Sequence, residues 1–230
     1  MVLRVIDIET TGLDPMADAI VEIASVDLTK EGGITNPQQT FVFPDQKIPA
    51  LASAVHHIVD DDVREAPRLR EALALFEGAD CYIAHNCSFE RSFLDPILGR
   101  QAWLCTFKCA LRIWPDFVEH NLQALRYQLG IVQPFGRPRQ EIVPHRAASD
   151  TIVTAAIAHV IMRQARWSDL MRWSQEPAHY TRLTFGKHRG QKLADVPVDY
   201  LDWMLKSDLE ADWKLSAKAE LERRQKERVA

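Results

Sequence analysis

Short apolar runs broken by single polar residues mark the first part of the chain as β-structure. Val5–Leu13 is rich in β-branched residues, and a second apolar run covers Ala19–Asp27. A third run spans Gln39–Phe43, and turn residues with glycines at positions 32 and 33 lie before it. Strands that follow one another with short turns pair with their neighbours in sequence, so this pattern predicts an antiparallel meander.

After position 50 the spacing of apolar residues changes to the period of helices. We predict short helices at Ser53–Ile58 and Leu69–Phe76 and a short buried strand at Cys81–Ala84. Asn121 is a good N-cap for a helix that Gly130 ends. The other predicted elements are helices at Phe89–Leu98, Phe107–Trp114, Leu122–Leu129 and Arg146–Arg163, a strand at Trp103–Cys105 and a loop at Val132–Pro144. A meander followed by alternating helices and strands predicts an α/β fold, with a mixed sheet of antiparallel and parallel strands flanked by helices.

The pattern weakens after the long helix, which predicts a division of the chain into three parts. Residues 1–165 form the main domain, and residues 166–182 form a linker or a docking helix. Residues 183–230 form a small C-terminal basic and helical segment, in which Ser216–Arg228 is a charged helix with no broad apolar face. We therefore expect one α/β core with a small appendage.

The charge of the chain argues against a protein that coats long stretches of DNA. The net charge is −4, whereas such proteins are basic overall. Residues 1–164 carry 15 Lys and Arg against 21 Asp and Glu, but residues 181–230 carry 11 against 9. An acidic body with a slightly basic tail fits an enzyme that acts on the end of a strand.

Three further features predict a cytoplasmic protein. No apolar run approaches the roughly 20 residues that a membrane span needs, so we expect no contact with a membrane. Acidic residues from position 7 onward do not fit a signal peptide. The four cysteines have neither the spacing of a zinc site nor that of a disulfide framework, and we expect reduced thiols at Cys81, Cys87, Cys105 and Cys109.

The first predicted strand carries two acids, Asp7 and Glu9, one residue apart. Side chains at alternate positions of a strand point to the same face, roughly 7 Å apart. Two carboxylates this close repel each other, and a cation between them removes that cost. Hard oxygen ligands favour Mg²⁺ or Mn²⁺. Two exposed acids at the end of a strand are an equally good interpretation of this pair alone.

Two later clusters supply further acids and a histidine. Glu90 ends the segment His85–Glu90, which follows the short buried strand, and lies in the first turn of the next helix. Asp150 lies early in the long helix, and His145 lies about one turn before it, at the loop–helix junction. The helix dipole alone stabilises an acid in a first turn, so each cluster by itself also fits a structural role.

Taken in order, three segments resemble the motifs of one enzyme family. They are Asp7–Gly12 (DIETTG), His85–Glu90 (HNCSFE) and His145–Asp150 (HRAASD). They resemble the three motifs of the DEDDh 3′→5′ exonucleases, which belong to the RNase H-like superfamily. The segments AVHHI, CTFKCALRIWP, FGKHRGQKLADVP and YLDWML resemble the exodeoxyribonuclease X branch, so the resemblance covers nearly the whole chain.

The resemblance implies an RNase H-like sheet and a site for two metal ions roughly 4 Å apart. Asp7, Glu9 and Asp150 would hold the ion that activates water. Asp7 would bridge to the second ion, whose shell Glu90 supports. His145 would be the general base, because imidazole exchanges protons near neutral pH, and it would swing in when substrate and metal ions are bound. Mg²⁺ is the expected cofactor, and Mn²⁺ is expected to substitute for it.

Glu90 departs from the pattern of the family, whose second motif usually ends in aspartate. Glutamate is one methylene longer and reaches the same ion from a slightly retracted backbone. We therefore expect activity to be retained, with ligation by Glu90 either direct or through water.

The same resemblance implies contacts with the substrate, in which backbone groups of the first motif would meet the terminal sugar. We expect these contacts from Thr10, Thr11, Gly12, Leu13, His56, Asn86, Phe89, Lys187 and Arg189. Leu13 would wedge beside the last base, and Phe89 would stack on a base. Lys187 and Arg189 lie in a turn suited to phosphate. A core position for Phe89, a packing role for His56 and a plain β-turn around Lys187 are the alternatives.

The function that the resemblance implies is that of a metal-dependent 3′→5′ exodeoxyribonuclease. It would hydrolyse phosphodiester bonds at DNA 3′ ends, release nucleoside 5′-monophosphates and serve DNA repair or end-trimming. The nearest alternative is an exoribonuclease or a polymerase proofreading subunit with the same site. A non-catalytic module that binds nucleic-acid ends is the other. DNA, single- or double-stranded, is the expected partner, while RNA and a homodimer stay open.

Overall fold

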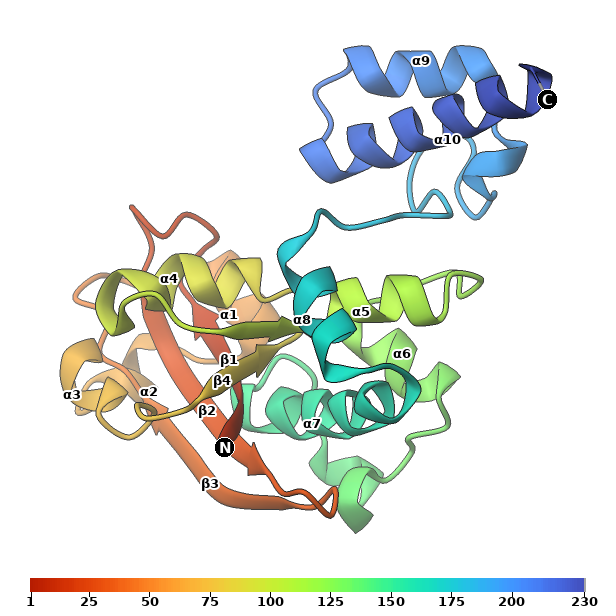
Figure 1. Cartoon of the computed structure of the whole chain (residues 1–230). Helices are drawn as coiled ribbons and strands as arrows, with labels where there is room; N and C mark the ends of the chain where they lie inside the picture. The colour runs from red at the N-terminus through yellow and green to blue at the C-terminus, as the bar shows by residue number, and fades with distance from the viewer. Residues whose placement is uncertain (230) are drawn as a thin grey trace.

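The computed structural model of the protein describes residues 1–229 and contains a five-stranded sheet in the order β3-β2-β1-β4-β5 (Figure 1). The strands are β1 (Leu3–Thr10), β2 (Ile20–Leu28), β3 (Ile34–Phe41), β4 (Cys81–Ala84) and β5 (Trp103–Cys105). β1, β2 and β3 pair antiparallel, as the predicted meander requires, whereas β4 runs parallel to both β1 and β5. The mixed sheet confirms the predicted fold class.

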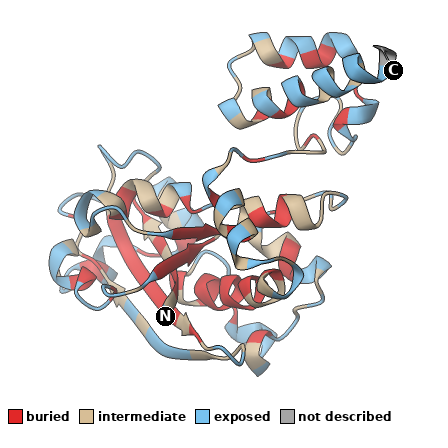
Figure 2. Cartoon of the chain, viewed as in Figure 1, coloured by how far each residue is buried: buried red, intermediate tan, exposed pale blue. Residues whose placement is uncertain are grey.

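Helices cover both faces of the sheet. On one face α7 (Ala147–Gln164) packs against β1 and β2, with α5 (Thr106–Ile113), α6 (Leu122–Gln128) and α8 (Trp167–Gln175) around it. On the other face lie α3 (Leu69–Leu73) and α4 (Ser88–Leu98). Figure 2 shows α7 as a largely buried helix, because neighbours enclose it on several sides. The first turn of α7 is thereby fixed beside the sheet.

The sheet edge explains where the predicted strands differ from the observed ones. β2 is covered on both faces, and all but one of its residues are buried. β3 is an edge strand, and it begins at Ile34 rather than at the predicted Gln39. Its first half contains Asn36 and Pro37, which an edge strand tolerates because one side of its backbone faces solvent.

The segment after the meander also differs in its boundaries. α1 (Ala50–His56) starts earlier than predicted and ends at His57, whose φ of 60° is left-handed. Ile58 was expected in this helix, but it lies beyond the helix end and packs in a small cluster with Val21. A four-residue helix, α2 (Asp60–Val63), follows and is not apparent from the sequence.

A hydrophobic cluster of its own holds the C-terminal unit (residues 177–229) together. In it, α9 (Val198–Lys206) packs against α10 (Ala211–Val229), which begins before the predicted start of the last helix. Trp213 and Ala217 are buried, four residues apart on one side of α10. This narrow stripe is enough to dock a helix that lacks a broad apolar face.

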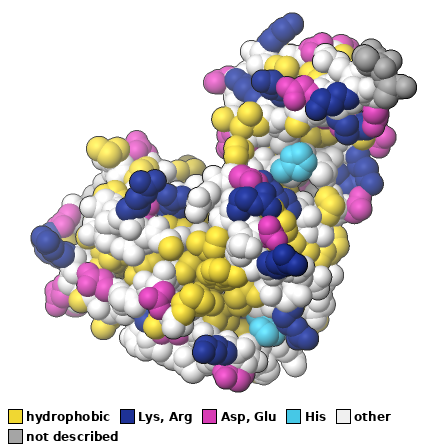
Figure 3. All heavy atoms as spheres, viewed as in Figure 1, with side chains coloured by type: hydrophobic (Ala, Val, Ile, Leu, Met, Phe, Trp, Pro, Cys, Tyr) yellow, Lys and Arg dark blue, Asp and Glu magenta, His cyan; other side chains and the backbone are white. Residues whose placement is uncertain are grey.

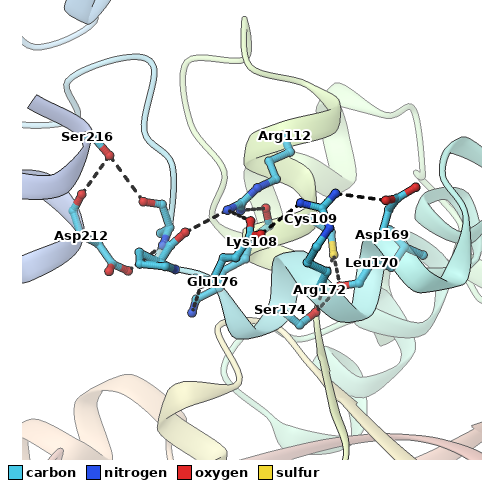
Figure 4. A network of polar contacts seen from close by, with 12 residues as sticks. Lys108, Cys109, Arg112, Asp169, Leu170, Arg172, Ser174, Glu176, Asp212 and Ser216 are labelled. Carbon is cyan, nitrogen blue, oxygen red and sulfur yellow. Dashed lines mark hydrogen bonds and ion pairs between the residues drawn. The ribbon is translucent and has the colours of Figure 1, made fainter. Parts of the chain in front are cut away.

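Polar contacts join the C-terminal unit to the rest of the molecule (Figure 4). Just after α8, Glu176 pairs with Arg112 of α5 at 3.0 Å, and the Glu176 carbonyl accepts a hydrogen bond from Lys108 Nζ at 2.8 Å. Asp212 of α10 accepts a hydrogen bond from the N–H of Ala178 at 2.9 Å. Arg112 Nη2 also donates to the carbonyl of Pro177 at 3.0 Å, so the chain just after α8 is held by α5 on one side and by α10 on the other.

Two ion pairs between the C-terminal unit and the loop before α6 add to these contacts. Lys192 pairs with Asp116 at 2.6 Å, and Arg189 pairs with Glu119 at 3.0 Å. The side chains of Asp116 and Arg189 are largely exposed. The joint, made by residues 107–119 and 176–212, thus combines ion pairs near the surface with a contact between the rings of Phe107 and Tyr180, whose centres lie 6.1 Å apart.

The outer surface shows charges of both signs. On the face drawn in Figure 3, Lys and Arg side chains are interspersed with Asp and Glu. None of the helices in residues 1–229 is long and apolar enough to cross a membrane. The four cysteines are buried and free, as predicted.

Candidate active site

Asp7 and Glu9 lie on the side of β1 that faces α7. Ile6 and Ile8, which alternate with them, are buried in the apolar cluster on the other face of the sheet. α7 brings Asp150 against the strand pair, and one carboxylate oxygen from each of the three acids lies within 4.8 Å of the others. The fold therefore brings together acids that are far apart in the sequence.

Two hydrogen bonds fix the carboxylate of Asp150. The N–H of His145 donates to Oδ2 at 2.8 Å, and Gln123 Nε2 of α6 donates to Oδ1 at 3.0 Å. Asp150 also lies in the first turn of α7, where the helix dipole favours a negative charge. These contacts hold the carboxylate in place independently of any bound ion.

Glu90 reaches the same cleft from the first turn of α4. Its side chain is only 3% exposed, and its Oε2 has no hydrogen-bond partner. A buried polar atom without a partner costs free energy, and native proteins contain few of them. An unpartnered carboxylate oxygen in a cleft lined by other acids indicates a place for a cation.

His145 stands at the rim of the cleft, between the preceding loop and α7. Its φ of 58° is left-handed, and its side chain is exposed. A left-handed residue that is neither Gly nor Asn costs about 1–2 kcal/mol. The chain accepts this cost at the residue that the sequence predicts to be the general base.

Burial and mutual repulsion raise the pKa values of the four acids. The pKa of Asp7 lies well above its ordinary value, because Asp7 is buried beside Asp150, Glu90 and Glu9. Burial, followed by the charge of Asp150, raises the pKa of Glu9 to about 8. Burial is also the main cause of the raised pKa values of Glu90 and Asp150. Without a cation, a pKa of about 8 lets Glu9 retain a proton near neutral pH.

The donor atoms of the cluster fit a divalent cation. All of them are carboxylate oxygens, the ligands that Mg²⁺, Mn²⁺ and Ca²⁺ prefer, whereas softer metals prefer nitrogen and sulfur. A cation there would relieve the repulsion between Asp7 and Glu9, and Glu90 Oε2 would be available as a further ligand. Asp7, Glu9 and Asp150 could hold such an ion directly, with Glu90 at the side of the same cleft.

We expect Mg²⁺ or Mn²⁺ to raise the melting temperature more at about pH 8.5 than at about pH 6. The raised pKa of Glu9 means that the metal-free native state binds a proton more tightly than the unfolded chain. The proton bound to Glu9 stabilises the metal-free native state below about pH 4.5, and this stabilisation is lost as the pH rises through about 8. A metal ion competes with this proton, so metal binding strengthens over the same range.

An ion at about 100 times its Kd should raise the melting temperature by about 5–10 °C at the higher pH. Thermal unfolding in EDTA, in Mg²⁺ and in Mn²⁺ at both pH values measures this gain. An equal gain at both pH values would contradict a site built from these carboxyl groups.

The acids line a cleft of about 660 Å³ that also has apolar walls. Six predicted substrate contacts line it as well: Thr10, Thr11, Gly12, Leu13, His56 and Phe89. Leu51 and Val55 of α1 form part of the wall. Leu13 is 83% exposed and Leu51 is 85% exposed, which is unusual for large apolar side chains near one another. The rim therefore offers apolar surface on which a base can stack.

The loop after β1 is held in shape by local contacts. Thr11 Oγ1 donates to Asp18 Oδ1 at 3.0 Å. A Cβ at Gly12 would lie 2.4 Å from Asp18 Oδ2, so a larger residue would displace the Asp18 carboxylate that accepts from Thr11. His56 lies behind the loop: its Nδ1 accepts the N–H of Ile58 at 3.0 Å, and its Nε2 is buried without a partner. The Nε2 therefore carries the proton and is a donor beside the cleft.

Three predicted substrate contacts lie outside this cleft. Asn86 lines a second cleft, of about 590 Å³, between the main domain and the C-terminal unit. Arg189 is engaged with Glu119 in the joint. Lys187 Nζ lies 5.3 Å from the centre of the Tyr200 ring. The structure does not bring these three residues together with the acids.

Two residues that contact the acids or their supports are not predicted by the sequence motifs. Gln123 donates to Asp150, and Glu22 on β2 lies opposite Glu9 in the ladder between β1 and β2. A charged residue inside the apolar second strand was a signal for Glu22. Gln123 carries no such signal, because its contact depends on how α6 packs against α7.

Comparison with known proteins shows relatives for two parts of the chain. The family model described as Exonuclease (RNase_T) matches residues 5–158, and one described as "Putative quorum-sensing-regulated virulence factor" matches residues 177–211. Exodeoxyribonuclease 10 of Escherichia coli (strain K12) is 36% identical over 208 residues, which cover 88% of this chain and 90% of that relative. A PolC-type DNA polymerase III of Staphylococcus haemolyticus (strain JCSC1435) is 30% identical over 172 residues, 70% of this chain but only 11% of the polymerase.

Solved structures share the fold. The structure "Exonuclease X in complex with 5′ overhanging duplex DNA" has a TM-score of 0.63 and 34% identity, and the match covers 75% of this chain and 99% of that one. E. coli Exonuclease I in complex with a dA16 oligonucleotide has a TM-score of 0.59 at 16% identity, covering 75% of this chain and 42% of that one, which shows likeness of fold alone. The family match over most of the chain and the 36% identity confirm the resemblance seen in the three motifs, and the chain belongs to the exonuclease family, among its DEDDh 3′→5′ members.

Proposed function

We propose that this protein is an Mg²⁺-dependent 3′→5′ exodeoxyribonuclease that releases nucleoside 5′-monophosphates from DNA 3′ ends. The observation that carries the proposal is the cluster of Asp7, Glu9 and Asp150, whose oxygens lie within 4.8 Å of one another in a cleft that Glu90 and His145 also line. Similarity to Exodeoxyribonuclease 10 and to an exonuclease bound to 5′-overhanging duplex DNA supports DNA as the substrate. We infer a role in repair or end-trimming of DNA.

We assign the metal site to the four acids. Asp7, Glu9 and Asp150 would hold one ion, and Asp7 would share a second with Glu90. When bound, divalent ions lower the pKa of a water molecule and neutralise charge on the phosphate. Mn²⁺ is expected to replace Mg²⁺, because both ions prefer oxygen ligands.

His145 is the proposed general base. A water molecule attacks the phosphorus of the last phosphodiester bond and gives its proton to the His145 imidazole. The bond between phosphorus and the 3′ oxygen of the penultimate nucleotide breaks, and that oxygen takes up a proton. The terminal nucleotide leaves with a 5′-phosphate. Imidazole suits this role because it exchanges protons near neutral pH.

The apolar rim is proposed to hold the terminal nucleotide by stacking. Leu13 and Phe89 line one cleft with Leu51, so that a base can lie between apolar surfaces. Stacking on an aromatic ring contributes about 1–3 kcal/mol and discriminates little between bases. Backbone groups of Thr10–Gly12 would contact the sugar, and the His56 Nε2–H would be a further donor beside them. This arrangement favours a non-specific exonuclease.

We propose that three parts of the chain have different roles. Residues 1–165 would carry the reaction, residues 166–182 would dock the remainder, and residues 183–230 would contact nucleic acid away from the reacting bond. Lys187 and Arg189 are the proposed phosphate contacts of this last part. Arg189 would exchange its partner Glu119 for a phosphate, whereas Lys187 lies on the exposed surface beside Tyr200.

Digestion of DNA labelled at the 3′ or the 5′ end tests the proposed function. With Mg²⁺ we expect the 3′ label to appear at once as a mononucleotide and the 5′ label to appear in a ladder of shortening strands. EDTA should stop both. A matched RNA that is degraded faster than DNA would replace this proposal by an exoribonuclease. Tight binding of DNA ends without cleavage in Mg²⁺ or Mn²⁺ would replace it by an end-binding module.

Glu90→Asp should retain activity within about tenfold of the wild type, whereas Glu90→Gln should lose about 100-fold or more. Aspartate keeps the negative charge and is one methylene shorter, while glutamine keeps the length and loses the charge. The measurement is kcat on 3′-labelled DNA over a range of Mg²⁺ concentrations. Full activity of Glu90→Gln would exclude Glu90 from the metal site.

A further inference from the structure

A fifth carboxylate lies beside the active site without belonging to the metal cluster. Glu22 on β2 is fully buried and lies opposite Glu9 in the ladder between β1 and β2. In contrast to Glu90, both of its oxygens accept hydrogen bonds from the protein. Its role therefore lies in the groups that it holds rather than in binding an ion.

Four hydrogen bonds converge on the Glu22 carboxylate. Oε1 accepts from Gln39 Nε2 at 2.7 Å and from Arg146 Nη2 at 2.8 Å. Oε2 accepts from Arg146 Nε at 3.2 Å and from the N–H of Ala147 at 3.0 Å. A bidentate contact between a carboxylate and a guanidinium fixes the orientation of the guanidinium as well as its distance.

Arg146 and Ala147 form the junction between the preceding loop and α7. Arg146 has an extended backbone, and Ala147 is the first residue of the helix. His145 lies directly before this junction, and Asp150 lies in the turn directly after it. A shift of the junction would move the proposed base and a metal ligand together, relative to the acids of β1.

We propose that Glu22 is a positioning residue for the reaction, which through Arg146 and Ala147 sets the first turn of α7 against β1. The inference rests on the proposed function, because such positioning matters only where Asp150 and His145 act with the acids of β1. The strand ladder strengthens it: Glu22 and Glu9 are paired across β1 and β2, so one pair of strands carries both the metal ligand and the anchor of the facing helix.

A second buried ion pair in the same ladder provides a matched control. Arg4 on β1 lies opposite Asp27 on β2, and it too makes a two-point contact, with Nε at 2.7 Å from Oδ1 and Nη2 at 2.9 Å from Oδ2. The two side chains are 7% and 16% exposed. This pair lies at the other end of the two strands, away from the acids. Asp27→Asn therefore removes the same kind of contact without touching the site.

The full-length variants Glu22→Gln and Asp27→Asn are compared for three quantities: kcat on 3′-labelled DNA, the Mn²⁺ concentration at half-maximal rate, and the melting temperature. We expect Glu22→Gln to lower kcat by about 10–100-fold and to raise that Mn²⁺ concentration about tenfold. Asp27→Asn should leave kcat and the Mn²⁺ concentration at half-maximal rate within about threefold of the wild type, even where the melting temperatures of the two variants fall by similar amounts. The inference would be overturned if Glu22→Gln kept the kcat and Mn²⁺ requirement of the wild type, or if Asp27→Asn lost as much kcat as Glu22→Gln.

Arg146→Lys tests the same inference independently of how well Glu22→Gln folds. Lysine keeps the charge but cannot make the two-point contact, so kcat should fall by about 3–10-fold with a smaller rise in the Mn²⁺ requirement. In the double variant the loss should not exceed that of Glu22→Gln alone, because both changes break one contact. Wild-type values for Arg146→Lys, or fully additive losses, would count against it.

Calorimetric titration with Mn²⁺ separates the two proposals. A wild type that does not degrade DNA would defeat the proposed function. Weaker Mn²⁺ binding in Glu22→Gln than in Asp27→Asn would still support the positioning of Asp150 by Glu22. Equal Mn²⁺ binding in the two variants would defeat the positioning, whatever the substrate is.

Discussion

Asp7→Asn should lower kcat by about a thousandfold or more, while the metal-free variant melts at a higher temperature than the wild type. Asp7 is buried among Asp150, Glu90 and Glu9, which together with burial raise its pKa well above the ordinary value. Asparagine keeps the shape of the side chain but loses the charge that is proposed to hold a cation. It also removes one of several repelling carboxyl groups, which stabilises the metal-free protein.

The gain in melting temperature should be larger at about pH 8.5 than at about pH 6, because a raised carboxyl pKa costs the native state more as the pH rises. Asp202→Asn on α9 is a suitable control, since Asp202 is exposed and should change neither rate nor stability. Rates on 3′-labelled DNA and thermal unfolding in EDTA provide both readouts. A variant with wild-type rates would remove Asp7 from the catalytic set, and a lower melting temperature would make its carboxylate a structural group.

His145→Asn should lower kcat by about 10²–10⁴-fold and leave the metal dependence unchanged. The change removes the imidazole that we propose takes the proton from water. It keeps the backbone, because asparagine tolerates the left-handed φ of 58° at this position. The N–H of residue 145 can then still donate to Asp150 Oδ2, so the proposed metal ligand stays in place.

His57→Asn offers a matched control for this substitution. His57 is also an exposed histidine with a left-handed φ, of 60°, but it does not line the cleft. We expect its kcat to stay within about twofold of the wild type, since surface changes of this kind have small effects. The comparison uses single-turnover rates with saturating Mg²⁺. A small effect of His145→Asn, or an equal effect of the two changes, would exclude His145 as the base.

The sequence predicts the strands well where burial and β-branching agree. β1 and β2 are apolar runs covered on both faces, and their pattern stands out against the rest of the chain. The first half of β3 is polar and contains Pro37, so only its pairing with β2 reveals it as a strand. The last helix, α10, starts at Ala211 and not at the predicted Ser216. Its first turns pack through Trp213 in the cluster that also holds α9, and such a contact depends on tertiary structure and not on helical propensity.

The sequence predicts the acids of the candidate site, but it does not predict the residues that hold these acids in place. Asp7, Glu9 and Asp150 meet where the order of the motifs indicates, because strand periodicity and a helix start have strong local signals. Glu22 and Gln123 act across the fold: one anchors α7 from β2, and the other reaches Asp150 from α6. Such contacts are set by how elements pack, and no local pattern of residues encodes them.

The joint between the main domain and the C-terminal unit has a consequence for the ancestry of the protein. The two matching family models cover residues 5–158 and 177–211, so the joint connects segments that match separate family models, although Exodeoxyribonuclease 10 matches across both. It combines ion pairs and single hydrogen bonds, such as Lys192 to Asp116, with the aromatic contact of Phe107 with Tyr180, and the two units keep separate apolar cores. An attachment of this kind can arise from a few surface substitutions that disturb neither core, and it can be exchanged as easily. Natural variants and engineered fusions should therefore differ in this unit far more freely than in the acids.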